Sequence, residues 1–210
     1  MISIKNFTFN SFEVNTYVLS DETKECIIID SACYEDFEKK IFYDYIEDNK
    51  LKPVRLLNTH CHIDHILGNA FVLEKYKLTT EIHKDGLPLL NNMKSYGMMF
   101  GITLEDIPKP TVFIEENQVI RFGNSSVKAL YLPGHADGSL AFYSEEGFVV
   151  VGDVLFNGSI GRTDLPTGNH ELLINNIKNK LFVLPDNTKV YCGHGPETTI
   201  GSEKGHNPYF

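Results

Sequence analysis

Alternating hydrophobic and polar positions open the chain. Three early segments, "ISIKNFTF", "NTYVLS" and "ECIIID", alternate or are rich in β-branched residues, and polar turns such as "SDETKE" separate them. This pattern predicts antiparallel strands. The following segment, "EDFEKKIFYDYIEDN", has Phe37, Ile41, Tyr45 and Ile46 at helical spacing, which predicts an amphipathic helix with these side chains on its apolar face.

Predicted strands and helices alternate through the rest of the chain. In the first half they are a strand "PVRLLNTH", a helix from Asp64 "DHILGNAFVLEKYK", a strand "TTEIHK" and a helix beginning at "GLPLLNN". In the second half they are two strands in "NQVIRFGNSSVKALYLPGH", a hairpin "SLAFYSEEGFVVVGD", a helix "NHELLINNIKNKLFVLP" with Asn169 as N-cap, and a strand "TKVYCGHG". Two comparable halves predict an α/β protein in which two sheets pack together with helices outside.

Composition narrows the classes of function. The chain of 210 residues has 42% hydrophobic residues, no internal repeat and no linker, so we expect one domain over residues 1–210. The net charge of −9 and the lack of a basic cluster disfavour nucleic acid as a partner. No signal peptide or membrane-length apolar run is visible, and the four cysteines form no CxxC pair. We therefore expect a cytoplasmic monomer or homodimer with reduced thiols, acting on a small molecule away from membranes.

One short stretch concentrates metal-binding residue types. In "NTHCHIDHILGN", His60 and His62 are two positions apart, so in extended backbone both imidazoles point to the same side. Asp64 and His65 come where the predicted helix begins, and the change of backbone direction would send them to a second position. This arrangement predicts two neighbouring metal sites, with Cys61 pointing away as a packing residue.

The remaining ligands must come from distant parts of the chain. Three candidates follow predicted strands and lie beside glycine: His135 in "LPGHADGS", Asp153 in "VVVGDVLF" and His194 in "VYCGHGP". Glycine lets the backbone turn sharply at such points. We interpret the other histidines and the cysteine before His194 as surface or packing residues; these are His83, His170, His206 and Cys192.

The four motifs, in this order, resemble the metallo-β-lactamase fold superfamily. "THCHIDH" matches its HxHxDH signature, "PGHADGS" its usual PGHTPGS, and "GD" and "GHG" its third and fourth motifs. The resemblance implies a four-layer αββα sandwich of two mixed sheets, with two metals at one edge. It implies that the first metal is bound by His60, His62 and His135 and the second by Asp64, His65 and His194. Asp153 would bridge both, and Asp30 would orient the ligands.

Within that superfamily, "GDVLFNGSIGRTDLPTGN" is similar to single-domain glyoxalase II-like hydrolases. We expect no counterpart of the helical C-terminal domain that helps the two-domain enzymes bind glutathione. The resemblance implies attack of a metal-bound hydroxide on a small thioester such as S-D-lactoylglutathione, with Asp64 also orienting the nucleophile. Nitrogen and oxygen ligands suit two zinc ions and also accept iron or manganese. Arg162 and Lys204 are candidates for binding substrate carboxylates, although ion pairs explain them equally well; Asp137 replaces a proline and adds a carboxylate of open role.

Other functions remain open at this point. The same fold and motifs occur in mononuclear iron persulfide dioxygenases, which would use only His60, His135 and Asp153. A metallo-β-lactamase is disfavoured by the lack of a signal peptide, and a nuclease by the net charge. A protein whose metals only stabilise its fold is disfavoured by the complete ligand sets.

Overall fold

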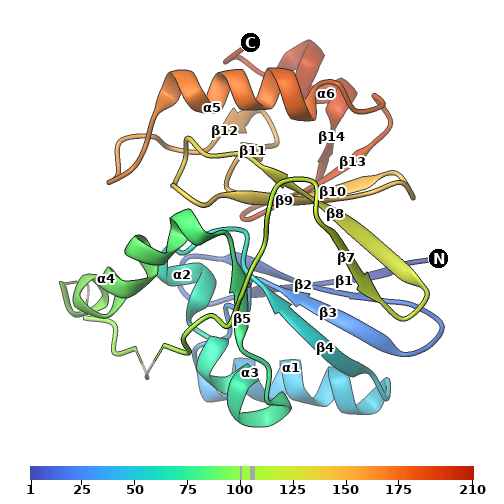
Figure 1. Ribbon diagram of the computed structural model, residues 1–210, viewed down its shortest axis with the longest axis vertical. Helices are drawn as coiled ribbons and strands as arrows, with labels where there is room; N and C mark the ends of the chain where they lie inside the picture. Colours follow the sequence, from blue (N-terminus) through green and yellow to red (C-terminus); the bar gives the residue numbers. More distant parts are fainter. Residues whose placement is uncertain (100, 105–106) are drawn as a thin grey trace.

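The computed structural model describes residues 1–99, 101–104 and 107–210. Its first half forms a six-stranded mixed sheet with the order β1-β2-β3-β4-β5-β6 (Figure 1). The pairs β1–β2 and β2–β3 are antiparallel, whereas the pairs β3–β4, β4–β5 and β5–β6 are parallel. The strands are β1 (Ser3–Phe9), β2 (Val14–Ser20), β3 (Glu25–Ile29), β4 (Lys52–Leu57), β5 (Thr80–Ile82) and β6 (Val112–Phe113).

The second half forms another six-stranded mixed sheet, with the order β14-β13-β10-β9-β8-β7. The one parallel pair in it is β10 with β13. Its strands are β7 (Val119–Phe122), β8 (Ser125–Tyr131), β9 (Leu140–Ser144), β10 (Phe148–Gly152), β13 (Lys189–Cys192) and β14 (Thr198–Thr199). A small hairpin of β11 (Leu155–Phe156) and β12 (Ser159–Ile160) follows β10.

Helices cover the outer faces of both sheets. Figure 1 shows α1 (Asp36–Asp48) and α3 (Asn69–Tyr76) below the first sheet, and α5 (His170–Asn176) and α6 (Ile200–His206) above the second. A π-helical turn (Ile177–Leu181) continues α5. At one end lie α2 (Ile63–Ile66), a 3-10 turn (Lys84–Gly86) and α4 (Leu87–Met99). The predicted αββα sandwich of two mixed sheets is therefore confirmed. Within the described residues no helix is long and apolar enough to cross a bilayer.

Alternation along β3 divides the core into layers. Ile27 and Ile29 point between the sheets and join the cluster that holds Phe122 and Phe142 of the second sheet. Ile28 points outward and packs in the cluster under α1. Successive strand residues face opposite sides of a sheet, so one β-branched run stabilises two layers. Burial of each such side chain contributes roughly 1.5–3 kcal/mol.

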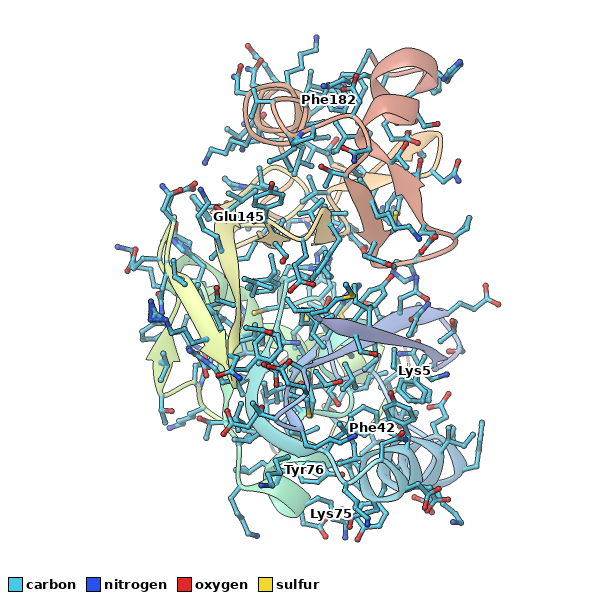
Figure 2. All side chains as sticks on the ribbon, turned by 90° about the vertical axis from the view of Figure 1, so that its right-hand side faces the viewer. Lys5, Phe42, Lys75, Tyr76, Glu145 and Phe182 are labelled. Atoms are coloured by element: carbon cyan, nitrogen blue, oxygen red, sulfur yellow. The ribbon has the colours of Figure 1, made fainter. Side chains whose placement is uncertain are left out.

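The predicted apolar face of α1 is partly wrong. Phe37 and Ile41 are 64% and 50% exposed, whereas Phe42, Ile46 and Glu38 are buried. Figure 2 shows Phe42 between α1 and the first sheet. The reason is Glu38, whose carboxylate accepts backbone N–H groups of residues 10, 34 and 35 and so turns the stripe 38–42–46 inward.

The helix predicted from Asp64 is broken in two. It begins at Ile63, ends at Ile66 and resumes at Asn69. Gly68 lies at the break, where a Cβ atom would stand 2.5 Å from Ser31 Oγ and 2.7 Å from Cys33 Sγ. This close approach to the chain after β3 excludes a larger side chain. Short elements with no readable period were missed by sequence reasoning: β6, β11, β12, β14 and α6.

Candidate metal centre

The HxHxDH stretch changes backbone type as expected. The chain leaves β4 at Leu57, bends at Thr59 and is extended at His62, which has φ −66° and ψ 151° and is the N-cap of α2. The first turn of α2 then carries Asp64 and His65 in a different direction. His60 and His62, which precede the helix, therefore belong to a different spatial group from Asp64 and His65, which lie within it.

Strand ends of the second sheet bring the distant residues to the same place. Asp153 directly follows β10, and His194 follows its parallel neighbour β13 after one glycine. That glycine is required, because a Cβ on Gly193 would lie 2.1 Å from Asp153 Oδ1. At Gly152, φ is +54° and a Cβ would lie 2.3 Å from Thr59 Oγ1. Both glycines permit the close approach of the two sheets at this edge.

The structure brings together all seven side chains that sequence reasoning selected. Potential ligand atoms lie within 4.8 Å of one another in three overlapping groups. These are His60, His62 and His135; Asp64, His65 and His194; and His60, His65 and Asp153. The first two coincide with the sets that the resemblance implied.

Asp153 lies against imidazoles of both sets. Its Oδ1 is 3.3 Å from His65 Nε2, and its Oδ2 is 3.6 Å from His135 Nε2 and 3.5 Å from His194 Nε2. Asp64 also lies against the second set, with Oδ2 3.4 Å from His194 Nε2. A carboxylate between two ligand groups is what a bridging role requires.

Oxygen acceptors fix the orientation of three imidazoles. The Nδ1 atoms of His65, His135 and His194 lie 2.9, 2.8 and 2.8 Å from Asp30 Oδ2, the Arg162 carbonyl and the Phe12 carbonyl. Each acceptor holds the proton on Nδ1 and leaves the Nε2 lone pair directed into the cluster.

Asp30 has the place that the resemblance implied for it. It is 1% exposed and adopts φ 54° at the end of β3. Besides His65, it accepts hydrogen bonds from Thr59 N at 2.7 Å and Thr59 Oγ1 at 2.6 Å. The Thr59 hydroxyl in turn lies 3.1 Å from His60 Nδ1. One buried carboxylate thus orients a histidine of each set.

Unpaired buried atoms indicate that the cluster is built for cations. Among the described residues, His60 Nε2, His65 Nε2 and Asp153 Oδ1 are buried and make no well-formed hydrogen bond, although the last two lie 3.3 Å apart. Leaving such an atom unsatisfied costs about 1–3 kcal/mol. Imidazole nitrogens and carboxylate oxygens suit zinc, iron or manganese. The donor set therefore fits a pair of divalent transition-metal ions.

The charges of the metal-free cluster are tightly linked. Burial disfavours the charged form of His65, but the carboxylates of Asp153, Asp64 and Asp30 raise its pKa well above the ordinary value. Burial likewise opposes protonation of His194, yet hydrogen bonds to Asp153 and Asp64 raise its pKa to about 10. His60, by contrast, has its pKa lowered well below 6.5 by burial and neighbouring histidines. A metal held by His65 and His194 would therefore bind in competition with protons, which the neighbouring carboxylates favour.

Residues interpreted as non-ligands lie outside the three groups. His83 is buried and stacks on Tyr131 with ring centroids 4.0 Å apart, while His170 and His206 are exposed. Cys61 and Cys192 are buried, and burial raises the pKa of both thiols, to about 12 for Cys192. These five side chains have structural explanations.

A cavity of about 340 Å³ opens onto the cluster. Arg162 lines it, and its guanidinium pairs with Asp164 at 2.8 and 2.7 Å. Lys204 does not line it; its ammonium group lies 2.6 Å from Asp186 Oδ1. Asp137 is exposed, and its backbone N–H donates to Thr167 Oγ1. The structure thus brings Arg162 to the site and leaves Lys204 in an ion pair elsewhere.

Sequence reasoning missed the residues that hold the ligands from behind. Phe12 contributes a backbone carbonyl, so its residue type carries no signal for that role. Asn10 has a left-handed backbone, with φ 54°, and its Nδ2 donates to the Asp64 carbonyl and the Ala32 carbonyl, each at 3.0 Å. Thr59 precedes the first motif histidine directly, which is a signal that could have identified it.

A family model for the metallo-beta-lactamase superfamily matches residues 10–194, which include all seven clustered side chains. The chain belongs to the metallo-β-lactamase superfamily. It is accordingly a metal-binding hydrolase of that superfamily.

Individual members of the superfamily resemble the chain over nearly its whole length. The hydroxyacylglutathione hydrolase GloC of Haemophilus influenzae is 34% identical, with 99% of this chain and 98% of that protein covered. The crystal structure of the B3 metallo-β-lactamase BLEG-1 is 32% identical, with a TM-score of 0.89 and 99% of each chain covered. The structure of TTHA1623 in a di-iron-bound form is 33% identical, with a TM-score of 0.87 and 98% and 100% coverage.

Proposed function

We propose that this superfamily member hydrolyses a small thioester with the help of two divalent metal ions. The observation that carries the proposal is the pair of adjoining three-residue ligand groups with Asp153 against both. His60, His62 and His135 would hold one ion, Asp64, His65 and His194 the other, and Asp153 both. Likeness to a hydroxyacylglutathione hydrolase supports thioesters as the substrate class, with S-D-lactoylglutathione as the reference compound.

When bound, the ions would supply Lewis-acid polarisation of the carbonyl and activation of water. The protein's own side chains would position the reacting groups and exclude bulk water from the site. Burial tends to raise the pKa of Asp64, but the effect of His65 and His194 is larger, and the net pKa is lowered. The Asp64 carboxylate is therefore ionised and would orient the attacking water by accepting a hydrogen bond from it. Asp30 and the Arg162 carbonyl keep imidazoles in one orientation throughout. The Arg162 side chain would bind a substrate carboxylate at the cavity.

Support for the finer points comes from the same site. The donor set suits zinc, and the di-iron form of a similar structure keeps iron as an alternative. We propose two zinc ions per chain and a small-molecule substrate. A cytoplasmic location and a monomer or homodimer remain predictions from the sequence.

The test combines metal analysis of the purified protein with a thioester assay. Two metal ions per chain and hydrolysis of S-D-lactoylglutathione or another small thioester are expected. One iron per chain, with oxygen consumed on glutathione persulfide, would establish a dioxygenase instead. Turnover of nitrocefin without turnover of any thioester would establish a β-lactamase.

A further inference from the structure

The walls of the catalytic cavity are strongly apolar. One face of α4 supplies Leu89, Met93 and Tyr96, at helical spacing of four and three residues. Leu89 and Met93 are only 8% and 2% exposed and belong to the same core cluster as Ile63 of α2. Because this wall is continuous with the core, its position is fixed by packing. It therefore presents a preformed hydrophobic surface to any bound molecule.

Two loops supply the other apolar lining residues of the cavity. Phe12 comes from the turn between β1 and β2 and is 43% exposed, while Leu165 and Pro166 follow Arg162 in the loop before α5. These side chains extend the apolar wall around the metal cluster. Apolar side chains from α4 and from both loops therefore line the space next to the metal cluster.

Positive charge in the cavity is limited. Among the described residues that line it, Arg162 is the one with a permanently cationic side chain, and Asp164 already neutralises it. Both partners are more than half exposed, so this pair is weak and can exchange for a single substrate carboxylate. A second carboxylate of a substrate would find no further permanently cationic side chain among these lining residues.

We propose that the thioester carries an apolar group of several carbons beside the scissile carbonyl, and that this group packs on the α4 stripe Leu89–Met93–Tyr96 and on Leu165. The inference rests on the proposed thioesterase function and names its substrate class. The apolar group can belong to the acyl part or to the thiol part. S-D-lactoylglutathione, with a hydroxyl beside the carbonyl and a charged thiol part, is expected to be a poorer substrate than a butyryl or hexanoyl thioester.

Two substrate series on the metal-loaded full chain test the proposal. One series lengthens the acyl group from acetyl to butyryl and hexanoyl on N-acetylcysteamine; the other lengthens an alkanethiol on a common acetyl group. We expect kcat/KM to rise about fourfold per added methylene in one series until the cavity is filled. The series that rises identifies which part of the thioester is apolar.

A pair of variants tests the wall itself. Leu165→Asn places an amide on the cavity wall, and Leu172→Asn makes the same change at a leucine of α5 that is 39% exposed and does not line the cavity. We expect Leu165→Asn to reduce the gain per methylene to less than twofold with unchanged metal content. Leu172→Asn should keep the fourfold gain. Equal chain-length dependence in both variants would overturn the assignment of Leu165.

The outcomes separate this inference from the proposed function. If S-D-lactoylglutathione is hydrolysed while both series are flat, the thioesterase function stands and the apolar substrate class is wrong. If no thioester is hydrolysed, the function is wrong, and calorimetry with inert thioether analogues of both series decides the inference alone. Affinity that rises with chain length would support the apolar site, and affinity that does not would overturn it.

Discussion

At the scale of single residues, the centre depends on groups that hold the ligands from behind. Three imidazoles use an oxygen acceptor on Nδ1, and two of these acceptors are backbone carbonyls, of Phe12 and Arg162. Orientation by such partners raises metal affinity, typically by 10- to 100-fold. A change that leaves every ligand in place can therefore still alter metal binding.

Asp153→Ala is expected to lose metal and activity together. Its carboxylate lies within 3.6 Å of imidazoles from both ligand sets, so its removal weakens both positions. Metal analysis by mass spectrometry of the purified variant measures this. Asp137→Ala, which removes an exposed carboxylate near His135, should keep two ions per chain. Retention of two ions by Asp153→Ala would contradict the bridging role.

Asn10→Gly is expected to weaken the Asp64–His65–His194 position selectively. The amide of Asn10 holds the Asp64 carbonyl, and its Oδ1 accepts from Phe12 N at 2.9 Å, so its loss loosens supports of two ligands. Glycine tolerates the positive φ, which leaves the side-chain contacts as the main loss. Metal titration should show that the affinity of the Asp64–His65–His194 position is lowered by 10-fold or more. Asn117→Gly is the matched control, because Asn117 has φ 64° and an exposed side chain. This variant should bind metal with the affinities of the unsubstituted protein.

Metal loading at pH 8 is expected to release at least one proton per chain. Burial opposes protonation of His194, but hydrogen bonds to Asp153 and Asp64 raise its pKa to about 10, so the metal-free protein holds this proton at pH 8. The His194 pair stabilises the metal-free fold fully below pH 6.5, and this stability disappears as the pH rises through about 10. Calorimetry in buffers of different ionisation enthalpy measures the release. A constant heat across buffers would contradict it.

At the scale of elements, prediction succeeded where a chemical motif or a period was explicit. The HxHxDH stretch pointed to four side chains that the structure brings into one cluster, because few structural reasons place three histidines and an aspartate together. Leu173, Ile177 and Leu181 recur four residues apart in the predicted helix "NHELLINNIKNKLFVLP", and all three are 0% exposed. The face of α1 was misjudged because a polar side chain, Glu38, sets its rotation through backbone contacts. Contacts between distant segments leave no local pattern to read.

Gly193→Ala is expected to disrupt the metal centre through the strand end that carries it. Its Cβ would stand 2.1 Å from Asp153 Oδ1 and 2.9 Å from the Gly152 carbonyl carbon, so β13 and β10 must separate. Gly195→Ala, at φ +70° with no atom within 4 Å, should cost roughly 1–2 kcal/mol of stability and keep its metal. Metal content and thermal unfolding of both variants distinguish these outcomes. Equal metal content would show that the strand end adapts.

At the scale of the whole molecule, the centre joins the two sheets. His60, His62, Asp64 and His65 follow β4 of the first sheet, whereas His135, Asp153 and His194 follow strands of the second. The apolar core between the sheets fixes the separation of the side chains that follow the first sheet from those that follow the second. Metal ions at this edge would therefore act as a further connection between the halves.

Removal of metal is expected to lower thermal stability. A ligand that binds only the folded state at a thousand times its Kd stabilises it by about 4 kcal/mol, roughly 10 °C in Tm for a chain of this size. Thermal unfolding before and after chelation measures the shift, and zinc added back should restore it. An unchanged Tm after verified metal removal would show that the sheets' own packing fixes the edge.

The division of ligands between the two sheets also has a consequence for biosynthesis. Neither ligand set is complete until residues 135 and 194 respectively have left the ribosome, since each set needs one histidine from the second sheet. A nascent chain that has exposed only "THCHIDH" can form at most a loose, partial chelate. Completion of either group therefore requires the second sheet, and a chain fragment that stops before residue 135 lacks at least one side chain of each proposed set.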